Sequence, residues 1–279
     1  MTLTAKWLQG IAAFFLLAFS LNAHAAPQND GTLRIVSLAP HLTEWVYSLH
    51  LERHLVAVSA FSDYPEQAKS LPRVADYQGA DIARIMALSP TLILAWEGGN
   101  KPSDINKLEQ MGYRVFKSNI NELFDISKEL KALGQITERE DIAQTLASNF
   151  EQQIVTLENS YKRTARIPVF YYSWTAPLMS IGPQAWPNKL LNICGAQTIL
   201  KDSPVDYPQV SIKEVLLRQP KILVAASKSS SKELNTFWAP HADFIDAPVI
   251  TVNPDITSRY TLRLADELKT LCEGINHRF

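Results

Sequence analysis

Two stretches of this chain, Ser70–Trp96 and Leu200–Ala226, follow the same pattern 130 residues apart without an insertion. Each predicts an aromatic loop, a short helix that begins after Asp81 or Ser211, a proline that ends the helix, and a buried apolar strand. Any two αβ units share this rhythm, but an Asp-Tyr pair also recurs in the loop. The repeat therefore favours two similarly built lobes. The nine matched pairs are Asp76/Asp206, Tyr77/Tyr207, Ile82/Ile212, Ile85/Val215, Pro90/Pro220, Leu92/Ile222, Ile93/Leu223, Leu94/Val224 and Ala95/Ala225.

Strand and helix patterns alternate along most of the chain. Thr43 is predicted to cap a helix that continues to Leu51, and Gly112 to end a helix that begins at Ser103. Because alternation is typical of parallel sheets, we expect an α/β protein whose two αβ lobes have mainly parallel central sheets. The predicted strands are 34–37, 55–61, 92–96, 113–118, 167–174, 221–226 and 247–253.

The middle of the chain, residues 121–164, has almost no strand signal. It predicts one helix over 121–136 and a longer one over 138–164, which at about 25 residues would span ~37 Å and run along both lobes. We therefore expect an N-terminal lobe over 34–120, a helical linker over 121–165 that joins the lobes through one long helix, and a C-terminal lobe over 166–279. The ligand cleft should lie between the lobes, and such a joint should permit little closure.

The first 25 residues read as a secretory signal peptide. Lys6 gives a basic start, an apolar run follows, and Ala23-His24-Ala25 forms a small-residue cleavage site. We expect an exported protein, and a formal net charge of -1 argues against a nucleic-acid partner. In an oxidising compartment the two cysteines, Cys194 and Cys272, can form a disulfide, with two buried free thiols as the alternative.

Aromatic residues are frequent in the loops that should line the cleft. For any one of them, a place at the edge of the core is an equal alternative. Several converging on one cleft would suit a large, flat, partly apolar ligand. The candidates are Phe61, Tyr64, Tyr77, Trp96, Tyr171, Tyr172, Trp174 and Tyr207.

Signatures of enzymes are absent from the sequence: it has no GxSxG, HExxH, P-loop or GxGxxG pattern. We therefore expect a binding protein and no catalytic residues. His41, directly after the first strand, is the one candidate for a metal ligand. An exposed polar residue at a strand end is favoured for it, because no partner set of His and carboxylate appears, and no metal site is expected.

Several segments together resemble the periplasmic cobalamin-binding proteins of ABC importers, over Arg34 to Cys272. They are IVSLAPHLTEW, FSDYPEQA, VADYQGADIARIMALSPTLILAWEGGN, the long linking helix, DYPQVSIKEVL and the cysteine pair. The resemblance implies cobalamin as a transported ligand rather than a cofactor. It also implies a periplasmic monomer whose partner is an inner-membrane importer of two permease and two ATPase subunits.

Carried over by position, the resemblance implies that the corrin ring lies between aromatic side chains and a loop of the second lobe. The family commonly has Tyr at Phe61 and Trp at Tyr77 and Tyr207, so ring faces are kept while a hydroxyl moves. The loop keeps the family's acid and arginine but lacks its middle aromatic. The implied ligand-binding residues are Phe61, Tyr77, Trp96, Tyr207, Asp255, Ile256, Thr257, Ser258 and Arg259.

The family's two permease-docking glutamates fall on Ala83 and Lys213, so that charge pairing does not carry over. The nearest acids are Asp81 and Glu214, for which a favourable interaction with the helix dipole is an equal alternative to docking.

The nearest rival function is a haem or ferric-siderophore binder on the same scaffold. A siderophore binder needs several cations in the cleft, where the loops offer Arg259 and Arg73. A zinc or manganese binder needs a His and carboxylate set that the sequence does not show. An extracellular enzyme is the weakest alternative.

Overall fold

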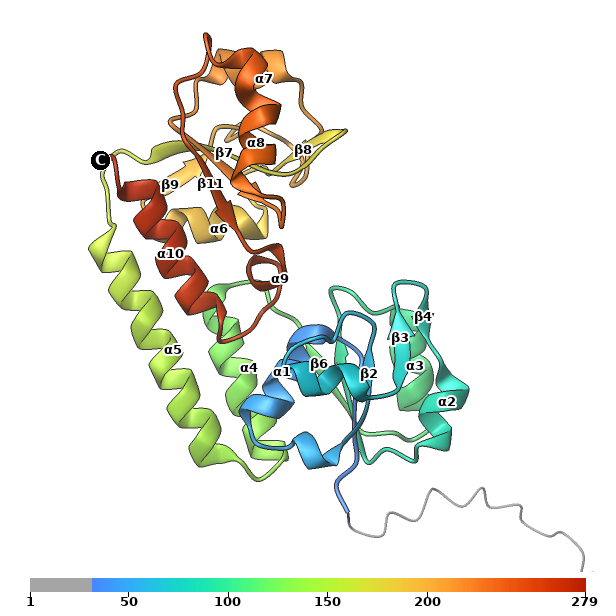
Figure 1. Ribbon diagram of the computed structural model, residues 1–279. Coiled ribbons are helices and arrows are strands. Elements are labelled where there is room, and N and C mark those ends of the chain that lie inside the picture. The colour runs from blue at the N-terminus through green and yellow to red at the C-terminus, as the bar shows by residue number, and fades with distance from the viewer. Residues whose placement is uncertain (1–31) are drawn as a thin grey trace, which may run out of the picture. The chain divides into compact units, whose positions relative to one another are not determined.

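The computed structural model describes residues 32–279 and builds the first lobe on a six-stranded sheet of order β4-β3-β2-β1-β5-β6 (Figure 1). All neighbouring strands are parallel except β3 and β4, which confirms the predicted sheet type. The strands are β1 (Ile35–Ser37), β2 (Leu55–Ser59), β3 (Arg73–Asp76), β4 (Gly79–Ala80), β5 (Leu92–Trp96) and β6 (Val115–Ser118).

The helices of this lobe are α1 (Pro40–Ser48), α2 (Ile82–Ala87) and α3 (Pro102–Gln110), with short 3₁₀ turns η1 (Glu52–His54) and η2 (Glu66–Ser70). The prediction that Thr43 caps the first helix is wrong. The helix begins at Pro40, whose fixed φ suits a first helical position. Thr43 lies one turn later, where its buried hydroxyl donates to Ser37 Oγ at 2.9 Å.

The linker consists of two helices, α4 (Leu123–Ile136) and α5 (Glu140–Ser160). They lie side by side, and α5 also contacts helices of the second lobe (Figure 1). A Cβ at Gly134 would lie only 2.3 Å from Ala143 Cβ, so glycine lets the two helices approach closely. The long helix has 21 residues, fewer than the expected 25 or so.

The second lobe is built on a five-stranded sheet of order β11-β10-β7-β8, in which β9 also pairs with β7. Only β7 and β8 are antiparallel. Its strands are β7 (Ile167–Thr175), β8 (Leu178–Ser180), β9 (Ala196–Thr198), β10 (Ile222–Ala226) and β11 (Val249–Val252). Its helices are α6 (Trp186–Ile193), α7 (Ile212–Arg218), α8 (Ser231–Trp238), η3 (Ala239–His241), α9 (Pro254–Thr257) and α10 (Leu264–Asn276).

The closing helix begins at Leu264, six residues later than the sequence pattern indicates. The preceding residues form α9 and then an irregular segment, residues 258–263, whose side chains and carbonyls contact the first lobe. These contacts with distant residues override the helical pattern of the segment.

The two repeated units agree in their helix ends. Asp81 and Ser211 accept the first capping hydrogen bonds, as predicted. Each helix is followed by a residue with positive φ, Ser89 at 45° and Gln219 at 46°, directly before the proline. The units differ upstream, because β3 and β4 have no strand counterpart in the second copy.

One apolar cluster extends from α1 and β1 through α4 and α5 to α6 and α10. The two lobes are therefore joined by a shared apolar core as well as by the linker helices. The predicted disulfide is present: Cys194 after α6 is bonded to Cys272 in α10, and both are buried. The lobe boundaries at 34–120, 121–165 and 166–279 stay predictions.

The signal-peptide interpretation of residues 1–25 lies outside the described residues. Within residues 32–279, no helix has both the length and the apolar character needed to cross a membrane.

Candidate functional site

Aromatic rings from both lobes meet where segment 258–263 reaches the first lobe. The ring of Tyr260 lies edge-on to Trp96 at 5.7 Å, to His41 at 5.4 Å and to Trp186 at 4.7 Å, measured between centroids. Trp45 completes the cluster, and its indole N–H donates to the Tyr260 carbonyl at 3.0 Å. Tyr260 and Trp186 were not among the sequence candidates. Tyr260 falls in a helical pattern, and Trp186 opens a helix, so neither carries a local signal of a cleft.

A pocket of about 250 Å³ opens beside this cluster. Five of the implied ligand-binding residues line this pocket. They come from both lobes and are distant from one another in sequence. The volume of the pocket is below the roughly 300–1,000 Å³ of pockets that enclose a drug-sized ligand, so it can hold only one edge of a large molecule. The lining residues are Pro40, His41, Phe61, Trp96, Asp255, Ser258, Arg259 and Tyr260.

Trp96 is held at the carboxyl end of β5 by a tight turn. Its backbone N–H donates to Asn100 Oδ1 at 2.7 Å, and the Asn100 amide donates to the Leu38 carbonyl at 2.8 Å. A Cβ at Gly99 would lie 2.1 Å from ring atoms of Trp96, so the backbone passes directly against the ring. The ring is partly buried against the shared core.

Phe61 projects from the turn after β2 with φ of 62° and is 72% exposed. Arg73 fixes this turn, since its guanidinium donates to the carbonyls of Ser59 at 2.9 Å and Ser62 at 2.8 Å. Arg73 therefore stabilises this turn of the first lobe, and it is not among the residues that line the small pocket.

Tyr77 and Tyr207, the matched tyrosines of the repeat, lie outside the small pocket. They are 83% and 58% exposed, which leaves their ring faces free. Partial burial raises the pKa of Tyr207, and a hydrogen bond with the backbone of Trp186 opposes this shift.

The loop 255–259 begins in α9, where Asn253 caps the helix by accepting from the Asp255 N–H at 3.0 Å. Thr257 is buried, and its carbonyl accepts from the Trp186 indole at 2.9 Å. Ser258 is exposed, and Ile256 is half-buried. The short α9 thus turns Asp255, Ser258 and Arg259 towards the pocket.

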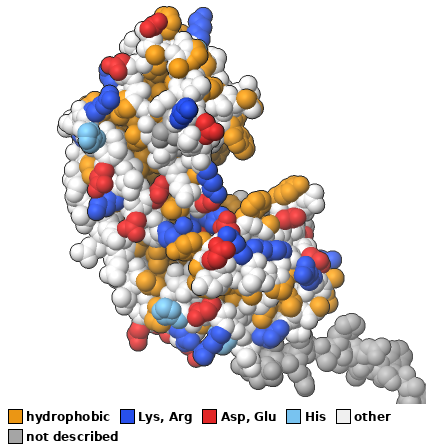
Figure 2. Space-filling model, in the orientation of Figure 1, with side chains coloured by type: hydrophobic (Ala, Val, Ile, Leu, Met, Phe, Trp, Pro, Cys, Tyr) orange, Lys and Arg blue, Asp and Glu red, His pale blue; other side chains and the backbone are white. Residues whose placement is uncertain are grey.

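The side chain of Arg259 is only 10% exposed, and three carboxylates surround its guanidinium. Its Nη1 lies 2.6 Å from Asp63 Oδ1 and 3.4 Å from Glu44 Oε1, and its Nη2 lies 3.8 Å from Asp255. Asp255 is also paired with Lys228. Figure 2 shows acidic and basic side chains next to one another at the indentation between the lobes. The cations of this site are therefore compensated.

Burial would lower the pKa of Arg259, but the hydrogen bond and charge of Asp63 raise it overall. Burial likewise would raise the pKa of Asp63, and the hydrogen bond from Arg259 makes the net shift downward. Both groups are therefore charged at neutral pH.

Three of the eight aromatic candidates do not line the cleft as expected. Tyr171 and Tyr172 are buried on opposite faces of the second sheet. Burial raises the pKa of Tyr171 to about 12, and the Tyr172 hydroxyl accepts from the Trp238 indole at 3.1 Å. Tyr64 lies in a separate groove under the guanidinium of Arg263, 3.7 Å from its ring centroid. Trp174 is 69% exposed at the end of β7.

His41 is buried rather than exposed, and it belongs to the aromatic cluster. Desolvation, and then the charge of Arg259, lower its pKa from 6.5 to about 3. Its ring is therefore neutral, with Nε2 3.4 Å from Ser118 Oγ. No group of three or more His, Cys, Asp or Glu residues in the part of the chain described is placed to hold a metal ion.

The candidate docking positions lie at the two repeated helices. Ala83, Lys213 and Asp81 are exposed. Glu214 is half-buried and lies 3.1 Å from Arg218 in the same helix. Asp81 accepts from the Arg84 N–H at 3.0 Å, so it has a capping role whatever else it does.

Two mainly parallel sheets in linked lobes, with aromatic and polar side chains of both lobes meeting between them, are the architecture of a two-lobed α/β ligand-binding protein. The chain belongs to the periplasmic binding protein family, whose model matches residues 35–239.

Its relatives include the vitamin B12-binding protein of Vibrio campbellii, 36% identical over 88% of this chain and 90% of the relative. The vitamin B12-binding protein of Photorhabdus laumondii is 34% identical over 97% of this chain and 98% of the relative.

Among solved structures, the periplasmic vitamin B12 binding protein BtuF of Vibrio cholerae has a TM-score of 0.75 and 34% identity. The matched region covers 88% of this chain and 96% of the BtuF chain. The periplasmic heme binding protein HutB of Vibrio cholerae has a TM-score of 0.73 at 19% identity, with 88% and 99% covered. The second likeness shows the fold alone.

Proposed function

We propose that this protein is the periplasmic substrate-binding subunit of an ABC importer and carries cobalamin in the cleft between its lobes. The observation that carries the proposal is the meeting of Phe61 and Trp96 from one lobe with Tyr260 and the Asp255–Arg259 loop from the other. Relatives that bear the name vitamin B12-binding protein, at 33–36% identity over most of their length, support the same ligand.

Cobalamin suits this cleft because its ring system is large and its faces are partly apolar. The pocket beside Trp96 would hold one edge, while the exposed rings of Tyr77 and Tyr207 supply further faces in the open part of the cleft. Asp255, Ser258 and Arg259 would bond polar groups at the rim. In the same proposal Ile256 contributes apolar surface, and Thr257 acts through its position in the loop, since its hydroxyl donates to the Asn253 carbonyl at 3.1 Å.

The charges of the site distinguish cobalamin from the rival ligands. Haem carboxylates and the oxygens of a ferric siderophore are best met by uncompensated arginines or lysines. Here Arg259 and Lys228 are paired with carboxylates, and Arg73 is engaged with backbone carbonyls. A ligand without a large negative charge fits this arrangement better.

The partner in this proposal is the inner-membrane importer with its two permease and two ATPase subunits. The protein would act as a monomer in the periplasm, without a cofactor or catalytic step of its own, cobalamin being cargo. Docking would use the two lobe tips at α2 and α7, around Ala83 and Lys213, with Asp81 and Glu214 as the acidic contacts.

Titration calorimetry with cobalamin, haem and a ferric siderophore tests the ligand. We expect saturable one-to-one binding of cobalamin, and an absorption spectrum of the purified complex that shows the corrinoid unchanged. Saturable binding of haem or siderophore with none of cobalamin would overturn the proposal.

A further inference from the structure

A buried carboxylate on the first lobe has its charged partners on the second. Glu44, in α1, is only 5% exposed. Arg263 donates to it through Nε at 2.8 Å and Nη2 at 2.6 Å, and Arg259 Nη1 lies 3.4 Å away. A carboxylate removed from water requires such compensation, because an isolated buried charge is strongly destabilising. Glu44 is therefore satisfied only when segment 258–263 is docked.

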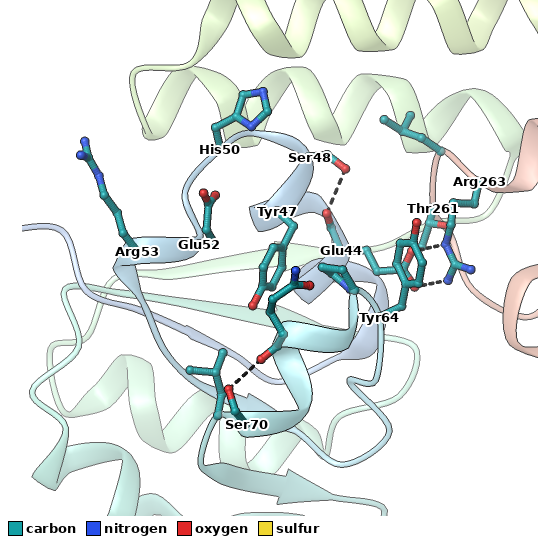
Figure 3. A pocket seen from close by; sticks show the side chains of 14 residues that line it. Glu44, Tyr47, Ser48, His50, Glu52, Arg53, Tyr64, Ser70, Thr261 and Arg263 are labelled. Carbon is teal, nitrogen blue, oxygen red and sulfur yellow. Dashed lines mark hydrogen bonds and ion pairs between the residues drawn. The ribbon is translucent and has the colours of Figure 1, made fainter.

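The contact between Glu44 and Arg263 also fixes an orientation. Two parallel N–H donors on one carboxylate hold a guanidinium in one plane, which a single contact does not. The Tyr64 ring covers the other side of this guanidinium, 3.7 Å away (Figure 3). Figure 3 shows Arg263 beside Tyr64, with dashed lines marking its contacts with Glu44. These residues lie at one edge of a groove of about 800 Å³.

The backbone of the same segment is held by the residue next to Glu44. Trp45 donates its indole N–H to the Tyr260 carbonyl at 3.0 Å, and the Tyr260 ring lies among Trp96, His41 and Trp186. Arg259 and Arg263 thus lie on either side of a main-chain contact that places the segment along α1.

This arrangement connects directly to the candidate ligand-binding loop. Arg259 is both the last residue of that loop and a partner of Glu44 and Asp63 in the first lobe. Asp255, at the other end of the loop, contacts Arg259 at 3.8 Å. A displacement of Arg263 or Arg259 would therefore move the polar rim and Tyr260 together.

We propose that Glu44 is a positioning residue for the cleft: through Arg263 and Arg259 it fixes the Asp255–Arg259 loop and the angle between the lobes before a ligand arrives. Its effect on affinity rests on the proposed function, whereas its effect on the lobes does not. Fixing the loop in advance removes the entropic cost of ordering it on binding.

The test compares Glu44→Gln, which keeps the shape but removes the charge, with Glu52→Gln. Glu52 is an exposed acid on the wall of the same groove, and no ion pair holds it in the described structure. Spin labels on cysteines introduced at exposed Lys107 and Lys232, one on each lobe, report the distance between lobes without ligand. The native disulfide is buried and stays intact.

We expect one narrow distance distribution in the wild type and in Glu52→Gln, and a broader one in Glu44→Gln at a temperature where all are folded. Cobalamin affinity should fall about tenfold in Glu44→Gln, a typical coupling between sites, and stay constant in Glu52→Gln. In a double-mutant cycle, Arg263→Gln should add little to Glu44→Gln, because both remove the same contact.

An unchanged distance distribution in Glu44→Gln would overturn the proposal, and so would a broadened distribution with unchanged affinity. If Glu44→Gln does not fold, Arg263→Lys serves instead, because it keeps the charge but loses the paired donors. It should broaden the distribution, and an unchanged one would again overturn the proposal. If the wild type binds no cobalamin, the proposed function fails while the distance measurement still decides the role of Glu44.

Discussion

The guanidinium of Arg259 lies 2.6 Å from the carboxylate of Asp63, although 196 positions separate the two residues. The contact joins the turn after β2 in the first lobe to the loop after α9 in the second. It neutralises the most prominent cation of the cleft and makes one surface from segments of both lobes.

This ion pair predicts a stability change in acid. The pKa of Asp63 is lowered from 3.8, so its contribution is complete above that value and is lost as the pH falls below it, through the lowered pKa. In Asp63→Asn the decline of melting temperature below about pH 4 should be shallower than in the wild type. Thermal unfolding between pH 2 and 6 measures this, and parallel curves would contradict it.

Tyr77→Ala should weaken cobalamin binding by about 1–3 kcal/mol, as expected for the loss of an aromatic anchor. Its melting temperature should not change, because the side chain is 83% exposed. Trp96→Ala should show a similar loss of binding together with a lower melting temperature, since its ring contacts His41 and Tyr260. Phe244→Ala, which removes a 70% exposed ring elsewhere, is the control for both.

Gly99→Ala should displace the Trp96 ring, because the new Cβ would lie 2.1 Å from ring carbons. We expect cobalamin binding weaker by about 1 kcal/mol, together with altered tryptophan fluorescence in the free protein. Gly274→Ala in α10 is the matched control, since its nearest contact would be 3.3 Å from a side-chain carbon of Ile250. Equal fluorescence and affinity in the two variants would show that the turn accommodates the methyl group.

The burial of His41 predicts a second pH dependence of stability, between its folded-state pKa of about 3 and its ordinary pKa of 6.5. Its pKa is 6.5 in an unfolded chain and about 3 in the folded protein, so only the unfolded state gains a proton between these values. Stability should therefore fall as the pH drops below 6.5, by up to about 1.4 kcal/mol per pH unit. Denaturant unfolding should show a flatter profile in His41→Gln and an unaltered one in His277→Gln, which changes an exposed histidine.

Docking through the repeated helices is tested by Asp81→Ser with Glu214→Gln. Serine keeps a capping acceptor for the Arg84 N–H, so charge is removed without removing the cap. Association with the permease should slow and become less salt-dependent, while cobalamin affinity stays constant. Glu158→Gln with Asp243→Asn removes two exposed acids elsewhere as a control. Unchanged association in the first pair would leave Asp81 and Glu214 as helix-end residues only.

Much of the local structure follows from the sequence because local interactions decide it. The caps at Asp81 and Ser211, the parallel strands and the cysteine pair all agree with expectation. The predicted cap at Thr43 does not agree with the structure. The helix begins earlier, at Pro40, because the fixed φ of proline suits the first helical position. The resemblance also anticipated five residues that meet at the pocket: Phe61, Trp96, Asp255, Ser258 and Arg259.

The sequence by itself determined where helices and strands form and which residues are aromatic or charged. Only the tertiary structure decided which of them face the cleft. Tyr171 and Tyr172 follow each other in β7 and point to opposite faces of the sheet, and both are buried because each face is covered. Arg73 and Arg259 look equivalent as sequence candidates, yet one binds carbonyls of its own lobe and the other binds carboxylates of the opposite lobe. Such pairings depend on how segment 258–263 docks onto α1, which no local pattern specifies.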